Sequence, residues 1–301
     1  MGTPAVAGLN PSQIRAISAA VTRRLTLVQG PPGTGKTHTA LRILTWWLRS
    51  MAHGTGPVLA TSDSNIAVDN MLEGLIKLGI RVVRLGRPDR VRPELMQYCV
   101  DVPPPGQLQV DWGAKMAALR NAQVVCSTCV GLGSDQLDGF TFAAVLLDEA
   151  SQVTEASSIV SICRGCEQLV LVGDQCQLPP TVSSQRAVEA GLAEPLFNRL
   201  VSLGVEPLLL DTQYRMHPGK HVFSSTNYYS VCTQPFPSFP RTSSMRGGSR
   251  TALKALRAAC QRDSRGPART GPLPLYLCSM AAKLQRGYHA TMLQRLRKWS
   301  E

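Results

Sequence analysis

The segment Gly30-x4-Gly35-Lys36-Thr37 has the residue types and the spacing that bind the phosphates of a nucleotide. Glycines allow the N–H groups of a loop to close around phosphate oxygens, and the start of the following helix adds a partial positive charge. Lys36 is then placed to reach the β- and γ-phosphates, and the Thr37 hydroxyl to ligate Mg²⁺. The predicted phosphate site consists of Gly30, Gly33, Thr34, Gly35, Lys36 and Thr37.

An acidic pair, Asp148 and Glu149, follows a second apolar run. A phosphate loop of this kind needs a carboxylate at the end of a neighbouring strand, where Asp148 would hold Mg²⁺ and Glu149 would take a proton from the attacking water. Two adjacent carboxylates are costly to bring together unless a cation or a polar partner compensates them. The alternative, that Asp148 is an ordinary helix cap before "DEAS", is weakened by the phosphate loop elsewhere in the chain.

Short apolar runs and helical patterns alternate along the chain, which predicts an α/β fold with a parallel sheet and crossover helices. The runs are apolar at nearly every position, as expected for strands buried on both faces. Strands are predicted at residues 25–29, 57–61, 80–85, 122–128, 143–149, 167–174 and 207–211. Helices are predicted at residues 11–21, 36–50, 66–78, 151–162 and 193–203. The glycine loop and the acidic pair are therefore expected at one edge of a buried sheet.

The composition changes along the chain in a way that divides it into segments. Prolines recur after residue 87, and we interpret residues 87–120 as a short insertion within a first domain, residues 1–203. Residues 231–301 are rich in Ser, Pro and Arg, which predicts a disordered tail. That tail holds 13 basic and two acidic residues, so it carries eleven of the twelve net positive charges.

Several classes of protein are disfavoured by the sequence. We find no secretion signal, and the apolar runs are far shorter than the ~20 residues that span a bilayer. Nine scattered cysteines fit a reducing compartment, so we expect an intracellular protein of the cytoplasm or nucleus, without a membrane. The pairs Cys126/Cys129 and Cys163/Cys166 are expected at opposite edges of the sheet, ~17 Å apart, because the first pair ends a strand and the second precedes one. One zinc ion cannot bridge that gap, so no zinc site is expected.

Seven segments occur in the order, and with much of the spacing, of the superfamily 1B helicases: LNPSQ, GPPGTGKT, SNIAVDN, VVCSTCVGLG, LLDEASQ, LVGDQCQLPPTV and QYRMHP. The chain most resembles the regulator-of-nonsense-transcripts group and its relatives, the GRF-type zinc-finger and immunoglobulin-mu-binding-type helicases, over residues 8–229. The resemblance implies a P-loop NTPase with a RecA-like sheet covered by helices on both faces, which binds Mg-ATP and single-stranded RNA or DNA. An unrelated ATPase such as an AAA+ module is disfavoured, because it has no place for GDQCQLPPT and QYRMHP.

The resemblance also implies roles for single residues around the nucleotide. Gln13 resembles the glutamine that reads the adenine edge, and Tyr214 the residue that stacks on the adenine. Gln177, with Asp174 nearby, resembles the residue that senses the γ-phosphate, and Arg215 resembles an arginine finger. The alternatives are an exposed helix residue for Gln13 and a surface ion pair for Arg215.

Ser64, Asn65 and Thr128 resemble positions that touch the nucleic-acid backbone in this family. Short polar groups at strand ends hold a phosphodiester without reading its sequence. The alternative for Ser64 is a cap of the helix that begins near Ile66.

The family pattern stops within the chain. Residues 204–230 resemble only the opening segment of a second RecA-like domain, and the later motifs have no match in residues 231–301. In the family, one of these later motifs carries a second arginine finger. Because an arginine finger contributes ~10³ to 10⁵ in rate, we expect nucleotide binding, with turnover and unwinding dependent on a second RecA-like domain or a protein partner. The alternative is a catalytically inactive fragment that binds nucleic acid non-specifically through its basic tail.

Overall fold

The computed structural model describes residues 8–50, 56–104 and 106–214. In this part of the chain, seven strands form one sheet in the order β3-β4-β2-β5-β6-β1-β7, and all neighbouring strands are parallel. The strands are β1 (Leu25–Gln29), β2 (Val58–Ser62), β3 (Val82–Leu85), β4 (Val124–Thr128), β5 (Ala144–Leu147), β6 (Gln168–Gly173) and β7 (Leu208–Leu209). The predicted parallel sheet is confirmed, and each predicted strand is found within two residues of its expected ends.

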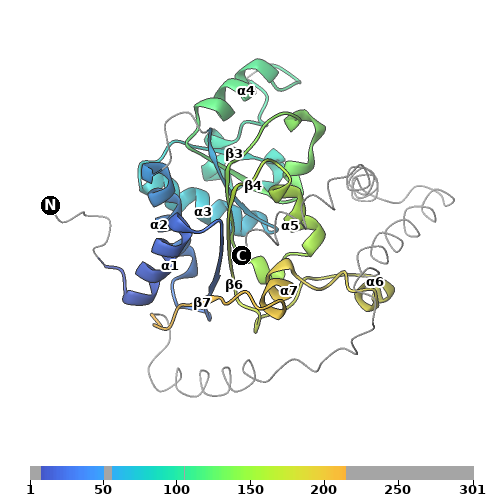
Figure 1. The fold of residues 1–301 in the computed structure, drawn as a ribbon. Helices are drawn as coiled ribbons and strands as arrows, with labels where there is room; N and C mark the ends of the chain where they lie inside the picture. The colour runs from blue at the N-terminus through green and yellow to red at the C-terminus, as the bar shows by residue number, and fades with distance from the viewer. Residues whose placement is uncertain (1–7, 51–55, 105, 215–301) are drawn as a thin grey trace. The chain divides into compact units, whose positions relative to one another are not determined.

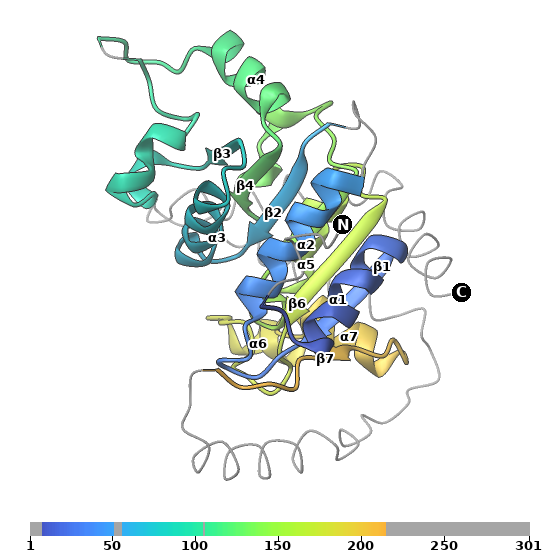
Figure 2. The same ribbon diagram turned by 90° about the vertical axis from the view of Figure 1, so that its left-hand side faces the viewer.

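Helices cover both faces of this sheet, as expected. Figure 1 shows α1, α2 and α3 on one face and α5 and α7 on the other, and Figure 2 shows the first three in front of the sheet. The helices are α1 (Pro11–Thr22), α2 (Lys36–Ser50), α3 (Asn65–Lys77), α4 (Trp112–Asn121), α5 (Glu155–Ile162), α6 (Gln185–Glu189) and α7 (Leu196–Ser202). Short 3-10 turns are η1 (Pro88–Arg90), η2 (Pro93–Tyr98), η3 (Gly131–Gly133), η4 (Asp135–Leu137) and η5 (Ala150–Gln152).

The hydrophobic core lies between the sheet and the three helices that precede β3. All five residues of β1 and of β2 are buried, as expected for strands covered on both faces. Trp47 of α2 is completely buried, and its indole N–H donates to the carbonyl oxygen of Ala20 in α1 at 2.9 Å. This contact fixes α2, the helix that begins at Lys36, against α1 and the sheet.

The predicted helix at 151–162 differs from the structure, and the segment 87–120, whose interpretation as an insertion stays a prediction, contains a helix that was not predicted. The first is divided, because Thr154 caps a new helix by accepting the N–H of Ser157, which leaves the separate turn η5 before it. The insertion contains α4, capped by Asp111, which the sequence did not predict. Its buried residues, Lys115 and Leu119, do not form the apolar stripe that identifies an amphipathic helix.

Residues 8–50, 56–104, 106–179 and 195–214 belong to one compact unit, and residues 180–194 belong to a second unit. The second unit contains α6, which was not predicted and which Ser184 caps. In the first unit β7 pairs with β1, so the start of the segment 204–230 continues the same sheet. The domain boundary at residue 203 stays a prediction, and the tail 231–301 lies outside the described residues.

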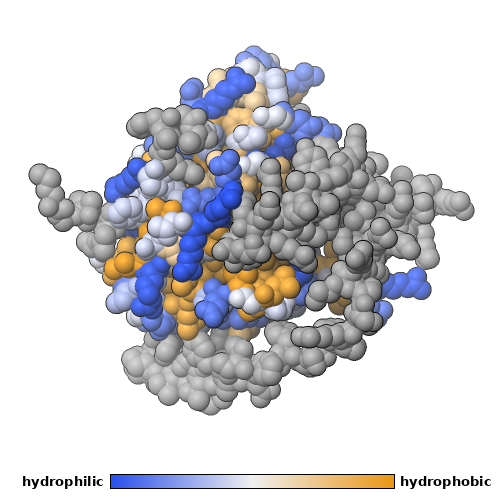
Figure 3. Space-filling view, viewed as in Figure 1, coloured by the Kyte–Doolittle hydropathy of each residue, from blue (hydrophilic) through white to orange (hydrophobic). Residues whose placement is uncertain are grey.

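The surface of the described residues is mixed in polarity. On the face seen in Figure 3, hydrophilic side chains in blue surround smaller hydrophobic areas in orange. No helix in the described ranges combines the length and the hydropathy needed to cross a membrane.

Candidate functional site

The carboxyl ends of the strands lie level with one another at one edge of the sheet. Gln29, the last residue of β1, pairs with Gly173 at the end of β6, and Ser62 at the end of β2 pairs with Thr128 at the end of β4. In open parallel sheets, ligands bind at this edge. The loops that carry most of the predicted site residues begin here.

The glycine loop follows β1 directly and folds tightly. The N–H of Gly30 donates to the carbonyl oxygen of Gly173 at 3.0 Å, which ties the loop to β6. Gly33 and Gly35 have φ of +82° and +83°, a backbone conformation that residues with a Cβ rarely adopt. A Cβ on Gly30 would lie 2.6 Å from the Thr34 hydroxyl, so this loop conformation requires glycine there.

Lys36, the first residue of α2, reaches back over the loop. Its side chain is only 9% exposed, and Nζ donates to the carbonyl oxygen of Gly30 at 2.9 Å. The ammonium is therefore held within the glycine loop by a backbone carbonyl, close to the start of α2. An anion that entered the loop could take the place of the carbonyl as its partner.

Thr37 and Asp148 meet, although they are far apart in the sequence. The Thr37 hydroxyl donates to Oδ2 of Asp148 at 3.4 Å. Asp148 follows β5, and its backbone N–H donates to the carbonyl oxygen of Thr61 in β2 at 2.8 Å, which fixes its position at the sheet edge. A hydroxyl and a carboxylate are the hard oxygen donors that Mg²⁺ prefers, so this pair fits the predicted ion.

The Asp148 carboxyl group is buried, and in the part of the chain that the structure describes no cationic side chain lies within hydrogen-bonding distance of it. Burial, and next the charge of Glu149, raise the pKa of Asp148 to about 6. The backbone N–H of Glu149, which donates to Oδ1 at 2.9 Å, opposes this shift only in part. A bound cation would compensate the carboxylate.

We expect the unliganded protein to lose stability as the pH rises from 4 to 6. Because the pKa of Asp148 is raised from 3.8 to about 6 by folding, its contribution is complete below 3.8 and is lost as the carboxyl ionises in the folded state. The loss is on the order of 3 kcal/mol, at 1.36 kcal/mol for each unit of pKa. Urea unfolding of wild type and Asp148→Asn across this pH range measures it. Parallel pH profiles for the two proteins would contradict the assignment.

Glu149 has an unusual backbone conformation. Its φ of 53° lies in the left-handed region, which costs about 1–2 kcal/mol for a residue with a side chain. Within the described residues, its Oε2 atom is buried without a hydrogen-bond partner. Strain and an unsatisfied buried acceptor are typical of functional positions, although the predicted role of Glu149 as a base stays a prediction.

Gln13 and Tyr214 both contact the glycine loop. Gln13 is 2% exposed, so the alternative of an exposed helix residue is wrong, and its Nε2 lies 3.4 Å from the carbonyl oxygen of Thr34. The backbone N–H of Tyr214 donates to the carbonyl oxygen of Gly33 at 2.9 Å. The Tyr214 side chain is 60% exposed, which leaves its ring available for stacking.

Asn10 connects these two residues, and the sequence reasoning missed it. Its Nδ2 donates to the Tyr214 hydroxyl at 2.8 Å, and its Oδ1 accepts the N–H of Gln13 at 2.8 Å. In a second, reciprocal hydrogen bond, the Gln13 side chain accepts the backbone N–H of Asn10 at 3.2 Å, which completes a capping box. The spacing of asparagine and glutamine could have revealed this box, but the contact with Tyr214 spans 204 positions.

Gln177 and Asp174 are also joined. Nε2 of Gln177 donates to Oδ2 of Asp174 at 3.0 Å, and the N–H of Asp174 donates to the hydroxyl of Ser151 at 3.0 Å. Asp174 is fully buried at the end of β6. Arg215 lies outside the described residues, so its predicted role stays untested.

The three predicted nucleic-acid residues lie at the carboxyl ends of the neighbouring strands β2 and β4: Ser64 and Asn65 come just after β2, and Thr128 is the last residue of β4. Ser64 caps α3 by accepting the N–H of Ala67 at 3.5 Å, so the capping alternative is observed. Oδ1 of Asn65 accepts a hydrogen bond from Arg84 at 2.8 Å, and the Thr128 hydroxyl accepts the N–H of Gly131 at 3.2 Å. Their contact with nucleic acid stays a prediction.

The two cysteine pairs lie near different strands, one at the end of β4 and the other before β6. Cys126 is in β4 and Cys163 precedes β6, and β2 and β5 separate these strands in the sheet. Burial raises the pKa of the Cys126, Cys129 and Cys166 thiols to about 12. Across the described ranges, no group of three or more His, Cys, Asp or Glu side chains could hold a metal ion.

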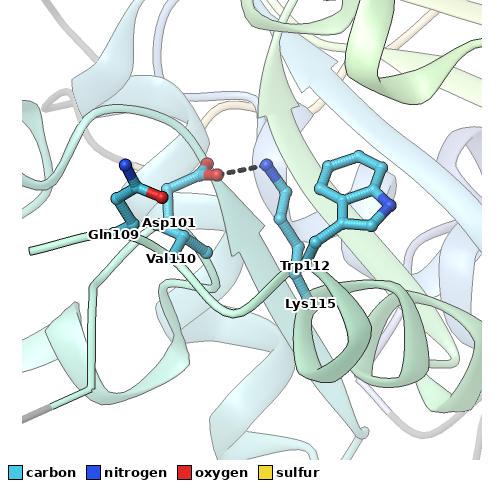
Figure 4. A pocket seen from close by; sticks show the side chains of 5 residues that line it. All are labelled: Asp101, Gln109, Val110, Trp112 and Lys115. Carbon is cyan, nitrogen blue, oxygen red and sulfur yellow. Dashed lines mark hydrogen bonds and ion pairs between the residues drawn. The ribbon is translucent and has the colours of Figure 1, made fainter. Parts of the chain in front are cut away.

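A separate pocket of about 490 Å³ lies in the predicted insertion and contains no predicted site residue. Figure 4 shows the Lys115 ammonium pointing at the Asp101 carboxylate, with the Trp112 ring alongside. Its lining residues are Asp101, Gln109, Val110, Trp112 and Lys115.

Comparison with known proteins identifies a family that matches the chain and several proteins that are similar to it. A family described as AAA domain matches residues 8–116 and 109–185. The regulator of nonsense transcripts 1 homolog of Arabidopsis thaliana is 37% identical over 77% of this chain, and ATP-dependent helicase NAM7 of Saccharomyces cerevisiae is 37% identical over 77%. A solved complex of the arterivirus nonstructural protein 10 helicase with DNA covers 72% of this chain and 42% of its own, at 15% identity and a TM-score of 0.43.

The homology confirms the resemblance found in the sequence. The description AAA domain does not by itself distinguish a superfamily 1B helicase from an AAA+ module. The relatives whose names identify them as helicases favour the first of these two interpretations. The chain spans 21% of the length of the Arabidopsis relative and 26% of the yeast one.

Proposed function

Because this chain belongs to the AAA domain family and is homologous to ATP-dependent helicases, we propose that it is a helicase-type protein that binds Mg-ATP. One observation carries the proposal: the Thr37 hydroxyl and the Asp148 carboxylate lie 3.4 Å apart, beside the loop in which Lys36 is held. These are the three side chains that a triphosphate and its Mg²⁺ require.

The roles of the residues follow from their chemistry. Lys36 neutralises the β- and γ-phosphates, and backbone N–H groups between Gly30 and Thr37 hold their oxygens. Thr37 and Asp148 hold Mg²⁺, which would polarise the phosphoryl oxygens when bound. Glu149 accepts the proton of the attacking water, because its buried carboxylate oxygen has no other partner among the described residues. Gln177, held by Asp174, responds to the γ-phosphate.

The adenine is bound between Gln13 and Tyr214. Beyond its bonds to Thr34 and Asn10, the Gln13 amide keeps one N–H and one lone pair, the donor and acceptor that an adenine edge requires, and the exposed Tyr214 ring offers a stacking surface. Asn10 holds both side chains in place, because its Nδ2 donates to the Tyr214 hydroxyl and its backbone N–H donates to Oε1 of Gln13. The nucleotide site thus uses α1, the glycine loop and the segment after β7.

Single-stranded RNA or DNA is the partner that we propose for the same sheet edge. Ser64, Asn65 and Thr128 contact its backbone, which carries no sequence information. Turnover and unwinding depend on a second RecA-like domain, which the chain would enter after β7 and to which Arg215 would contribute the arginine finger, or on a protein partner. Such a protein acts inside the cell, in the cytoplasm or nucleus.

Titration of the wild-type chain with Mg-ATP tests the nucleotide part of this proposal. A ligand that binds only the folded state raises its stability by about 2.7 kcal/mol at 100 times the dissociation constant. We expect a rise in melting temperature with Mg-ATP that exceeds the rise with ATP and EDTA. An unchanged melting temperature with both would overturn the proposal.

The charge of residues 231–301 favours a second candidate function, a catalytically inactive fragment that binds nucleic acid through its tail. Deletion of these residues discriminates between the two. If Ser64, Asn65 and Thr128 form the main site, we expect the truncated chain to retain ATP-responsive binding of a single-stranded oligonucleotide, with a weaker dependence on salt. Fluorescence anisotropy at several salt concentrations measures both quantities. Complete loss of binding would favour the tail.

A further inference from the structure

Arg84 is an arginine that the structure buries completely. It lies in β3, its side chain is 0% exposed, and it is among the largest fully buried side chains of the described residues. Arginine is almost never fully buried unless its charge is paired. Its surroundings therefore require an explanation beyond the packing of a strand.

The partner of the Arg84 charge is Asp69 of α3, which is 1% exposed. Nε of Arg84 donates to Oδ1 of Asp69 at 2.9 Å, and the backbone N–H of Arg92 donates to Oδ2 at 3.0 Å. Both carboxylate oxygens thus have donors. A hydrophobic pair of similar volume often gives a fold equal stability, so packing alone does not call for these charges.

A second nitrogen of Arg84 holds Asn65. Nη2 donates to Oδ1 of Asn65 at 2.8 Å, while Nη1 donates to the carbonyl oxygen of Leu85. A guanidinium has only donors, so the amide of Asn65 must turn its oxygen inward. Its NH₂ group is then left for an acceptor other than Arg84, at the first residue of α3, which follows the helix cap Ser64.

We propose that Arg84 is a positioning residue that fixes the Asn65 amide with its NH₂ group toward the nucleic-acid backbone. This inference rests on the proposed contact of Asn65 with nucleic acid. A phosphodiester offers only acceptors, so a rotated amide would present its oxygen to the phosphate and lose the bond. The pairing with Asp69 neutralises Arg84 and holds its guanidinium in the plane that reaches Asn65.

Arg84→Lys separates positioning from simple support of the fold. A lysine can keep the ion pair with Asp69, but its single ammonium cannot also bridge to Asn65 with the fixed geometry of a guanidinium. The double variant Arg84→Met, Asp69→Asn removes both charges and leaves the residue 69 amide oxygen for the N–H of Arg92. Together these variants keep the test valid if one of them folds poorly.

The experiment compares full-length wild type, Asn65→Ala, the two Arg84 variants, and Asn65→Ala in each Arg84 background. Binding of single-stranded uridine and thymidine oligonucleotides is measured by fluorescence anisotropy, and Mg-ATP affinity is the control. Loss of one hydrogen bond is worth about 3- to 10-fold in affinity. We expect each Arg84 variant to lose as much as Asn65→Ala, further Asn65→Ala substitution to add nothing, and Mg-ATP affinity to stay unchanged.

The outcomes distinguish the inference from the function on which it rests. If Asn65→Ala binds both oligonucleotides as wild type does, the proposed contact fails and the role of Arg84 fails with it. If Asn65→Ala weakens binding but the Arg84 variants do not, the contact stands and the positioning role is overturned. An undiminished effect of Asn65→Ala in the Arg84 backgrounds also overturns it, because the two residues would then act independently.

Discussion

Replacing Lys36 with alanine is expected to weaken the binding of Mg-ATP by on the order of 10²- to 10⁴-fold, because two charge-assisted hydrogen bonds to phosphates are lost, at about 1.5–3 kcal/mol each. The ammonium is held within the glycine loop by the carbonyl oxygen of Gly30, and it is mostly buried. The charge lost is therefore poorly screened by water. Isothermal titration calorimetry with Mg-ATP measures the loss directly.

Lys77→Ala is the matched control for this substitution. Lys77 lies at the end of α3, its side chain is 71% exposed, and it pairs with Glu73 on the same helix. An exposed ion pair of this kind is screened by water and contributes little, and the end of α3 does not belong to the proposed phosphate site, so its removal should leave the affinity for Mg-ATP unchanged. Equal affinity of wild type and Lys36→Ala would remove the phosphate site from the proposal. Equal losses in both variants would show an effect of overall charge.

The sequence predicted the sheet and the phosphate loop because both are encoded locally. The apolar run 25–29 and the helix that begins at Lys36 match β1 and α2 to the residue, since glycines and a lysine mark the junction between them. The meeting of Thr37 with Asp148 could also be anticipated. It follows from the parallel arrangement, in which all strands end at the same edge.

The parts that the sequence did not reveal depend on contacts between distant segments or on strain. The bond between Asn10 and Tyr214 joins the beginning of α1 to the chain after β7, and no local pattern indicates it. Arg84 stands within an apolar run, but its complete burial depends on Asp69 from another element. The left-handed conformation of Glu149 opposes the local preference of a glutamate, so only the folded structure reveals it.

Replacing Trp47 with alanine is expected to destabilise the protein by about 3–5 kcal/mol, the range for deleting a large buried aromatic side chain. Trp47 is completely buried in the core, and its indole N–H bonds to the carbonyl oxygen of Ala20, which would be left without this partner. Urea unfolding, followed by circular dichroism, measures the change in the free energy of unfolding.

Trp46→Ala is the matched control, because this neighbouring tryptophan is only partly buried on the same helix. Trp46 has the same helix propensity and the same volume as Trp47, so a much smaller loss of stability is expected from its removal. Equal losses of stability in the two variants would contradict the assigned packing.

Where Trp47→Ala still folds, it should also lower the affinity for Mg-ATP. Trp47 fixes α2 to α1, and α2 begins with Lys36 and Thr37. A helix that moves against the sheet would place the ammonium and the hydroxyl less accurately, so Mg-ATP affinity should fall in Trp47→Ala and not in Trp46→Ala.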